Sequence, residues 1–159
     1  MAQSFLAQMN VARLLHPEGD ERVAGFFENL DRINALAEGS DGFIWRLTDE
    51  DGGDATGIRV SPDPLLIVNM SVWRDVETLK AFAYRSGHAQ IMAQRRDWFE
   101  PSDQPMLALW WVSENAMPRP EHGMARLNFL RRKGPSEKAF TFATAAQYPA
   151  PSEVLADPA

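Results

Sequence analysis

The stretch that decides the fold is LLIVNMSVW, residues 65–73, which follows two closely spaced prolines. Its side chains alternate between the two faces of a predicted strand. One face carries only apolar residues, and the other adds Asn69 and Ser71 to an apolar background that ends in Trp73. Because both faces are largely apolar, we expect both faces of the sheet to be covered.

Working outward, the same alternation predicts three further strands, and helical spacing of apolar residues predicts three helical segments. The expected strands are residues 4–11, 43–48, 65–73 and 106–112. The expected helical segments are residues 20–39, 75–99 and 120–134. Asp20 is a favoured N-cap, Gly39 a plausible C-terminal stop and Pro120 an allowed first helical residue. The middle segment should break or bend near Ser86-Gly87.

This order, β-α-β-β-α-β followed by an extra helix, is typical of the ferredoxin-like α+β fold, in which helices cover one face of a four-stranded antiparallel sheet. The 159 residues fit one domain, which we place at 1–142, with a mostly irregular tail over 143–159. Too few helices remain for a second layer. We therefore expect a second copy of the chain to cover the bare face, giving a homodimer by sheet-on-sheet packing.

The composition excludes several classes of function. The net charge is −6, whereas a nucleic-acid-binding surface needs a basic patch, so we expect no nucleic-acid partner. The cluster Arg131-Arg132-Lys133 lies where a helix should end, and the helix dipole favours cations there. No cysteine is present, which excludes disulfides and thiolate chemistry. The start of the sequence lacks signal-peptide features and no apolar run spans a membrane, so we expect a cytoplasmic protein.

The segment SGHAQIMAQRRDWF, residues 86–99, contains the candidate functional residues. Helical steps of about 100° per residue place His88 and Arg95 on one otherwise apolar stripe. An unpaired buried guanidinium is costly, so Arg95 either has a partner, reaches solvent along its stem or meets a ligand anion. His88 is either a structural histidine or a catalytic one. The other residues expected to line a polar–aromatic pocket are Asn69, Ser71, Trp73, Tyr84, Trp98 and Trp110.

Motifs for phosphate binding and for a serine nucleophile are missing from the sequence. The histidines, His16, His88 and His122, lack the spacing to a carboxylate that marks a zinc helix. The acidic run from Asp49 to Asp54 lacks the spacing of a calcium loop, so we interpret it as a solvated loop. We therefore expect no bound metal and no tightly bound cofactor.

Over residues 69–99 and beyond, the sequence resembles the domain-of-unknown-function family numbered 3291. The motifs N-M-S-V-W, F-x-Y-R-S-x-H, R-R-x-W-F and L-W-W carry the resemblance, which covers nearly the whole chain. The matching residues are Asn69, Ser71, Trp73, Tyr84, Arg85, His88, Arg95, Arg96, Trp98, Phe99, Trp110 and Trp111. The resemblance implies a dimeric α/β-barrel of ferredoxin-like subunits and no agreed activity. That broader fold is similar to that of cofactor-free monooxygenases and cyclases, but fold alone does not imply function.

Three hypotheses follow. The first is a cofactor-independent enzyme, monooxygenase- or cyclase-like, acting on a small aromatic or polyketide-like molecule. In it, His88 is the general acid or base and Arg95 stabilises an oxyanion, while Asn69 and Tyr84 position the substrate. The second is a haem protein with His88 as axial ligand and Arg95 on a propionate. The third is a non-catalytic ligand-binding or structural dimer.

Overall fold

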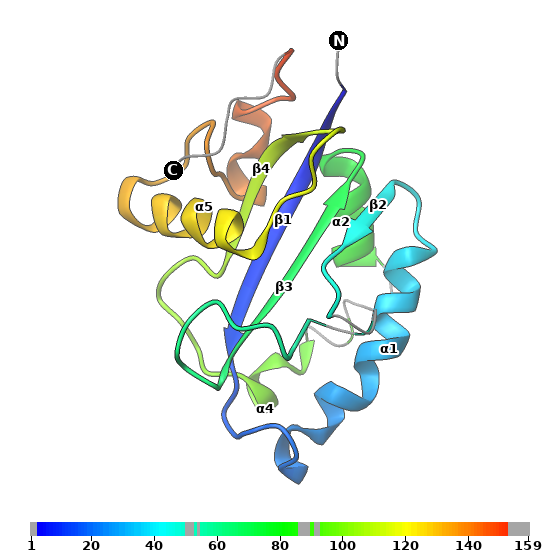
Figure 1. Ribbon diagram of the computed structural model, residues 1–159, viewed down its shortest axis with the longest axis vertical. Coiled ribbons are helices and arrows are strands. Elements are labelled where there is room, and N and C mark those ends of the chain that lie inside the picture. The colour runs from blue at the N-terminus through cyan, green and yellow to red at the C-terminus, as the bar shows by residue number, and fades with distance from the viewer. Residues whose placement is uncertain (1–2, 50–52, 54, 86–89, 91–92, 153–159) are drawn as a thin grey trace.

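The computed structural model describes residues 3–49, 53, 55–85, 90 and 93–152, and the statements below refer to these residues. Its centre is a four-stranded antiparallel sheet in the order β2-β3-β1-β4. The strands are β1 (Ser4–Arg13), β2 (Phe43–Arg46), β3 (Leu66–Trp73) and β4 (Leu107–Ser113). This is the strand order of the ferredoxin-like fold, so the predicted α+β class is confirmed (Figure 1).

The described α-helices lie within the predicted segments, and the break expected near Ser86-Gly87 lies outside the described residues. They are α1 (Ala24–Glu38), α2 (Val76–Arg85), α4 (Arg95–Trp98) and α5 (Pro120–Lys133), with two 3₁₀ helices, η1 (Glu21–Val23) and η2 (Phe142–Gln147). Asp20 caps η1 as expected, because its Oδ1 accepts a hydrogen bond from the Arg22 backbone N–H at 2.8 Å. Among the described residues, no helix is long and apolar enough to cross a membrane.

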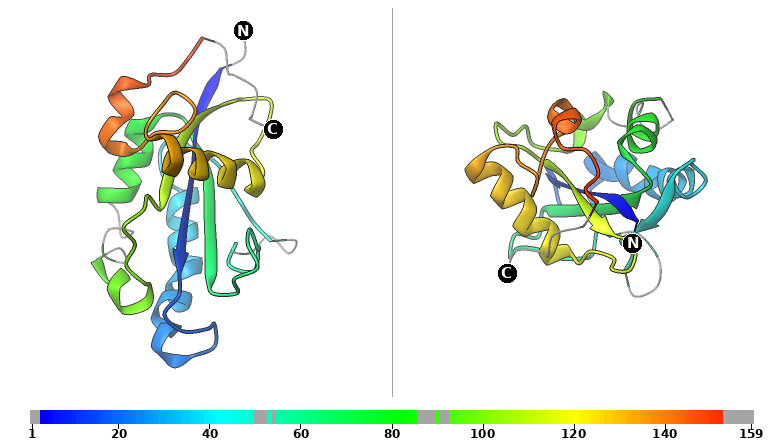
Figure 2. Two further views of the ribbon diagram at one scale, coloured as in Figure 1. Left: turned by 90° about the vertical axis from the view of Figure 1, so that its left-hand side faces the viewer. Right: turned by 90° about the horizontal axis from the view of Figure 1, so that it is seen from above.

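One face of the sheet packs against η2, α2 and the C-terminal end of α1. Leu6, Trp73 and Leu109 of the strands form a buried cluster there with Leu79 of α2. A second cluster, at the end of β1, joins Leu14 to Trp98 of α4. Figure 2 shows α2 and α4 together on one side of the strands and α5 on the other. The face that carries Asn69 and Ser71 is therefore the face covered by these helices.

The second face of the sheet is covered by the chain itself, which corrects the expectation of a bare face. Met9, Met70 and Trp110 are completely buried there, in a cluster that includes Leu127 and Leu130 of α5. The sequence argument counted the last helix as an addition to the fold, whereas α5 is the second layer. Apolar residues on both faces of β3 therefore no longer argue for sheet-on-sheet dimerisation, and the homodimer stays a prediction without that support.

Residues 143–147, the first part of the expected tail, belong to η2, and residues 153–159 lie outside the described residues. The backbone of Phe140 exchanges two hydrogen bonds of 2.9 Å with Leu109, which extends the edge of β4. Trp111 Nε1 then donates a hydrogen bond of 2.9 Å to the carbonyl of Tyr148. The region after Phe140 is thus held against the sheet by backbone and side-chain contacts that its Ala- and Pro-rich composition did not indicate.

Candidate functional site

A cavity of about 480 Å³ lies between the sheet and the helices α1, α2 and α4. Its walls are mostly apolar and aromatic, with Phe26 of α1, Phe82 of α2 and Trp98 of α4 among the lining residues. Its floor comes from β1 and β3. The edge strand β2 pairs with the end of β3 near Ser71 and Trp73, and α1 lies on the β2 side of the sheet (Figure 1).

The structure brings together most of the predicted site residues at this cavity. The predicted residues that line it are Asn69, Ser71, Trp73, Tyr84, Arg95 and Trp98. Tyr84 is 62% exposed, and its ring makes a T-shaped contact with the ring of Phe142, with 5.7 Å between the ring centroids. His88 lies outside the described residues, so its predicted roles as acid, base or haem ligand stay predictions.

Trp110 is the predicted site residue that the structure does not bring to the cavity. Neighbouring residues of a strand point to opposite faces, and Trp110 is fully buried on the face beneath α5. Trp111 lies on the same face of the sheet as Asn69 and Ser71. There its ring packs against the ring of Phe140, with 6.4 Å between the ring centroids. We therefore remove Trp110 from the site and assign it to the core.

Arg95 begins α4 and lines the cavity, half-buried, while its neighbour Arg96 is exposed. Within the described part of the chain, the Arg95 guanidinium forms no hydrogen bond or ion pair. The other charged residue in the lining, Arg46, is engaged by Glu38 at 2.9 Å and by the Gly53 carbonyl at 2.8 Å. None of the described lining residues is an Asp or Glu. Among the described lining residues, no carboxylate therefore neutralises the positive charge that Arg95 brings to the cavity.

The short helix α4 is fixed in place by backbone bonds to the end of β1. The Leu15 N–H donates to the Trp98 carbonyl at 2.8 Å, and the Glu100 N–H donates to the Arg13 carbonyl at 2.9 Å. Arg13 also bridges Asp63 and Glu100, each at 2.7 Å. Its hydrogen bond to Asp63 holds the pKa of that carboxyl below its usual range. These contacts position Arg95 relative to the sheet.

The floor of the cavity contains two residues that the sequence analysis did not single out, Gln8 and Asn10. Gln8 Nε2 donates to Asn69 Oδ1 at 2.7 Å and to Ser71 Oγ at 2.8 Å. Asn10 Nδ2 donates to Gln8 Oε1 at 2.9 Å. A signal was available, because alternation along residues 4–11 already placed both amides on the same strand face as Leu6, which is buried.

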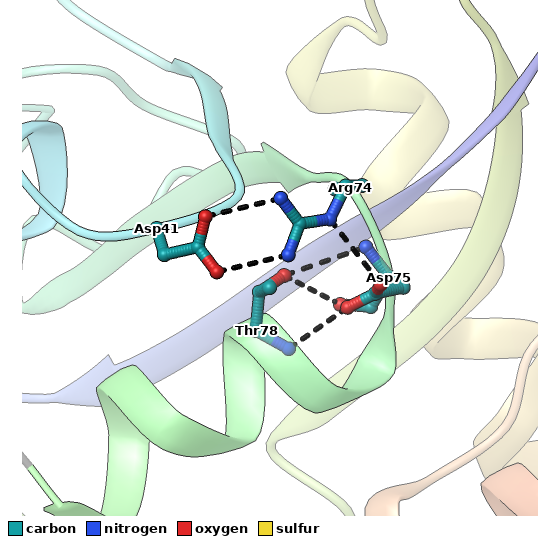
Figure 3. Close-up of polar contacts among 4 residues, drawn as sticks. All are labelled: Asp41, Arg74, Asp75 and Thr78. Carbon is teal, nitrogen blue, oxygen red and sulfur yellow. Dashed lines mark hydrogen bonds and ion pairs between the residues drawn. The ribbon is translucent and has the colours of Figure 1, made fainter.

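A separate polar cluster, at the junction of β3 and α2, is structural (Figure 3). Arg74 makes two hydrogen bonds to the Asp41 carboxylate, at 3.0 and 2.9 Å, which lower the pKa of Asp41. Asp75 Oδ1 accepts from the Thr78 N–H at 2.9 Å and so caps α2. These groups satisfy one another. Elsewhere too, the described residues contain no group of three or more His, Asp or Glu side chains placed to hold a metal ion.

Comparison with known proteins assigns a family but no activity. The model of the family described as "Domain of unknown function (DUF3291)" matches residues 5–156. A comparison with curated proteins found no match. The solved structure of NE2512, a protein of unknown function from Nitrosomonas europaea, is similar with a TM-score of 0.47 and 13% identity, covering 76% of this chain and 98% of that one. The solved structure of PA3566 from Pseudomonas aeruginosa is similar with a TM-score of 0.47 and 10% identity, covering 73% of this chain and 99% of that one.

Proposed function

Since this chain belongs to the DUF3291 family, whose description assigns no activity, we propose a function from its cavity: it binds a small organic acid with a largely apolar body. The carboxylate of this acid pairs with Arg95, and the body lies among the aromatic side chains of α1, α2 and α4. The observation that carries the proposal is the Arg95 guanidinium, which lines the cavity without a partner among the described residues.

Electrostatics favour an anion over a neutral or cationic ligand. A half-buried guanidinium that lacks a protein partner gains most from a carboxylate, which can accept two parallel N–H bonds. A hydrogen bond to a charged group contributes about 1.5–3 kcal/mol. A cationic ligand would meet Arg95 with no described acidic residue in the lining to offset the repulsion, whereas Arg46 is already paired with Glu38.

The apolar walls favour a ligand with a hydrophobic frame. Burial of apolar surface contributes about 25 cal/mol per Å², so an aromatic body gains affinity that a small polar acid such as acetate does not. Trp73 is held as part of this wall, stacked on Phe82 at 5.1 Å and edge-on to Phe43 at 5.6 Å. A wall fixed in this way needs little reordering when a ligand binds.

The cofactor-independent enzyme expected from the sequence builds on the same binding site. In that hypothesis, Arg95 stabilises negative charge on the bound substrate and His88 transfers a proton. Binding of the acid supports this hypothesis and the non-catalytic one equally, so binding is the property to test first.

The test is isothermal titration calorimetry with 2-naphthoate on the wild type, Arg95→Met and Arg96→Met. Arg95→Met removes the charge and keeps the aliphatic stem, so we expect affinity to fall about 10- to 100-fold. Arg96→Met removes an equal charge from an exposed neighbour and should leave affinity within about twofold. No binding by the wild type, or an equal loss in both variants, would overturn the proposal.

A further inference from the structure

We infer that the cavity has a second, neutral polar subsite on the sheet, which recognises a hydroxyl or carbonyl group of the bound acid away from its carboxylate. The subsite, here called the amide cluster, consists of Gln8, Asn10, Asn69 and Ser71. All four line the cavity. This inference rests on the proposed function and narrows its ligand class to hydroxy- or oxo-substituted apolar acids.

The amide cluster is built by strand register. Gln8 lies directly opposite Ser71, and Asn10 lies directly opposite Asn69, in the antiparallel pairing of β1 with β3. Side chains opposite one another in such a pair lie within contact distance. The four polar side chains therefore form one connected patch at the centre of the sheet, beneath the helices that enclose the cavity.

The hydrogen bonds within the cluster leave part of its capacity unused. Asn69 Oδ1 accepts from both Gln8 Nε2 and Asn10 Nδ2, at 2.7 and 3.3 Å, while Ser71 Oγ accepts from Gln8 Nε2 and Trp73 Nε1, each at 2.8 Å. Within the described residues, the Asn69 amide nitrogen and the Asn10 carbonyl oxygen have no partner. The cluster thus offers a donor and an acceptor side by side.

The presence of an unused donor and an unused acceptor does not depend on how the amide groups are oriented. Turning over the amides of Gln8, Asn10 and Asn69 together reverses the direction of each bond between them and keeps every contact. The unused donor then belongs to Asn10 and the unused acceptor to Asn69. In both arrangements, the cavity floor presents one donor and one acceptor, the pair that a hydroxyl or an enolisable carbonyl can satisfy.

The same two strands show that the cluster is not required by the sheet. Their other face carries the apolar residues Met9 and Met70 at neighbouring positions, both fully buried. Asn69 is exposed although it lies mid-strand on the face covered by α2 and α4, because the cavity opens above it. Its amide is therefore accessible to a polar group of a ligand bound in the cavity.

The spacing between the amide cluster and Arg95 sets the length of the ligand. Helix α4 is tied to the end of β1 by the bridge between Leu14 and Phe99. Asn10 lies four residues before Leu14, or about 13 Å along the strand at about 3.3 Å per residue. This separation favours an acid whose carboxylate and second oxygen lie at opposite ends of an apolar body, and a two-ring acid with an oxygen on its far ring is such a probe.

The test compares 2-naphthoate with 6-hydroxy-2-naphthoate by calorimetry, on the wild type, Asn69→Leu and Asn34→Leu. The two acids share a frame and a carboxylate and differ by one distal hydroxyl. We expect the hydroxyl to raise wild-type affinity about five- to tenfold, as one satisfied hydrogen bond does. Asn69→Leu should abolish that gain, so that the two acids bind this variant with equal affinity. Asn34, an asparagine of α1 in the same cavity outside the cluster, is the matched control, and Asn34→Leu should retain the gain.

The outcomes separate the two proposals. If 2-naphthoate binds through Arg95 but the hydroxyl adds nothing, or its gain survives Asn69→Leu, the second subsite is wrong and the proposed function stands. If the gain is lost equally in Asn34→Leu, the hydroxyl does not contact the amide cluster and the inference also fails. If neither acid binds, both proposals fail. Circular dichroism and thermal melts of each variant establish that it is folded.

Discussion

Gly42 occupies a position where the backbone and a neighbouring helix leave no room for a side chain. Its φ is +84°, in the region that favours glycine, and a Cβ built there would overlap the Thr78 side chain of α2. Its carbonyl accepts a hydrogen bond of 2.7 Å from the Arg74 N–H. Gly42 thus allows the turn before β2 to pack closely against the start of α2.

We expect Gly42→Ala to lower the free energy of unfolding by about 2–4 kcal/mol, combining backbone strain with overpacking. The control is Gly19→Ala, because Gly19 also has a positive φ, +96°, but has no atom within 4 Å of its Cβ position. That variant should lose only about 1 kcal/mol. Urea denaturation measures both, and equal losses would show that the contact with Thr78 costs nothing.

The ion pair between Arg13 and Asp63 makes stability depend on pH. Arg13 lowers the pKa of Asp63 in the folded protein, so this carboxylate stabilises the fold above its unfolded pKa. That contribution is lost as the pH falls below about 4 and passes through the lowered pKa that Asp63 has in the folded protein. We expect the urea midpoint to drop between pH 7 and pH 3, and to drop less in Asp63→Asn. Asp31→Asn, at an exposed site outside the described ion pairs, should behave like the wild type; an unchanged drop in Asp63→Asn would contradict the assignment.

At the scale of elements, α5 forms the second layer of the fold. Leu127 is completely buried against the sheet, whereas Arg132 of the same helix is exposed. We expect Leu127→Ala to lower the free energy of unfolding by about 2–4 kcal/mol, as removal of a buried leucine does. Arg132→Ala should change it by less than about 0.5 kcal/mol. If urea denaturation showed that Leu127→Ala leaves the free energy of unfolding nearly unchanged, α5 would not cover this face.

The strands and long helices could be predicted because each shows a single clear period of apolar residues. Alternation at residues 65–73 placed Asn69 and Ser71 on the correct face, and Asp20 and Pro120 marked helix starts. What α5 packs against could not be predicted, because an amphipathic helix does not specify its partner. For the same reason, Trp110 was predicted to line the pocket, although it lies on the face beneath α5.

Only part of the site could be predicted, because the rest depends on contacts between segments that are far apart in the sequence. Helical spacing showed that Arg95 lies among apolar residues, but only the fold shows that the described part of the chain supplies no carboxylate to it. The amide cluster depends on the register of β1 with β3, which joins residues more than 60 positions apart. Register follows from the packed sheet rather than from either strand alone.

Across the whole molecule, a chain of net charge −6 contains a cavity whose charged residues, among those described in its lining, are arginines. A ligand that binds only the folded state stabilises it, by about 2.7 kcal/mol at a concentration of 100 times Kd. We expect saturating 2-naphthoate to raise the thermal midpoint of the wild type and of Arg96→Met. At the same ligand concentration, the midpoint of Arg95→Met should rise clearly less than that of the wild type, because its affinity is lower. A rise of equal size in all three proteins would place the binding elsewhere.

The most direct test of the organic-acid site is a crystal structure of the protein with 6-bromo-2-naphthoate, in which anomalous scattering locates the bromine. The account predicts a bromine peak inside the cavity, toward the amide cluster, with the carboxylate within hydrogen-bonding distance of Arg95. The peak should be absent from isomorphous crystals of Arg95→Met treated in the same way. A peak outside the cavity, or one that persists in Arg95→Met crystals, would contradict the account.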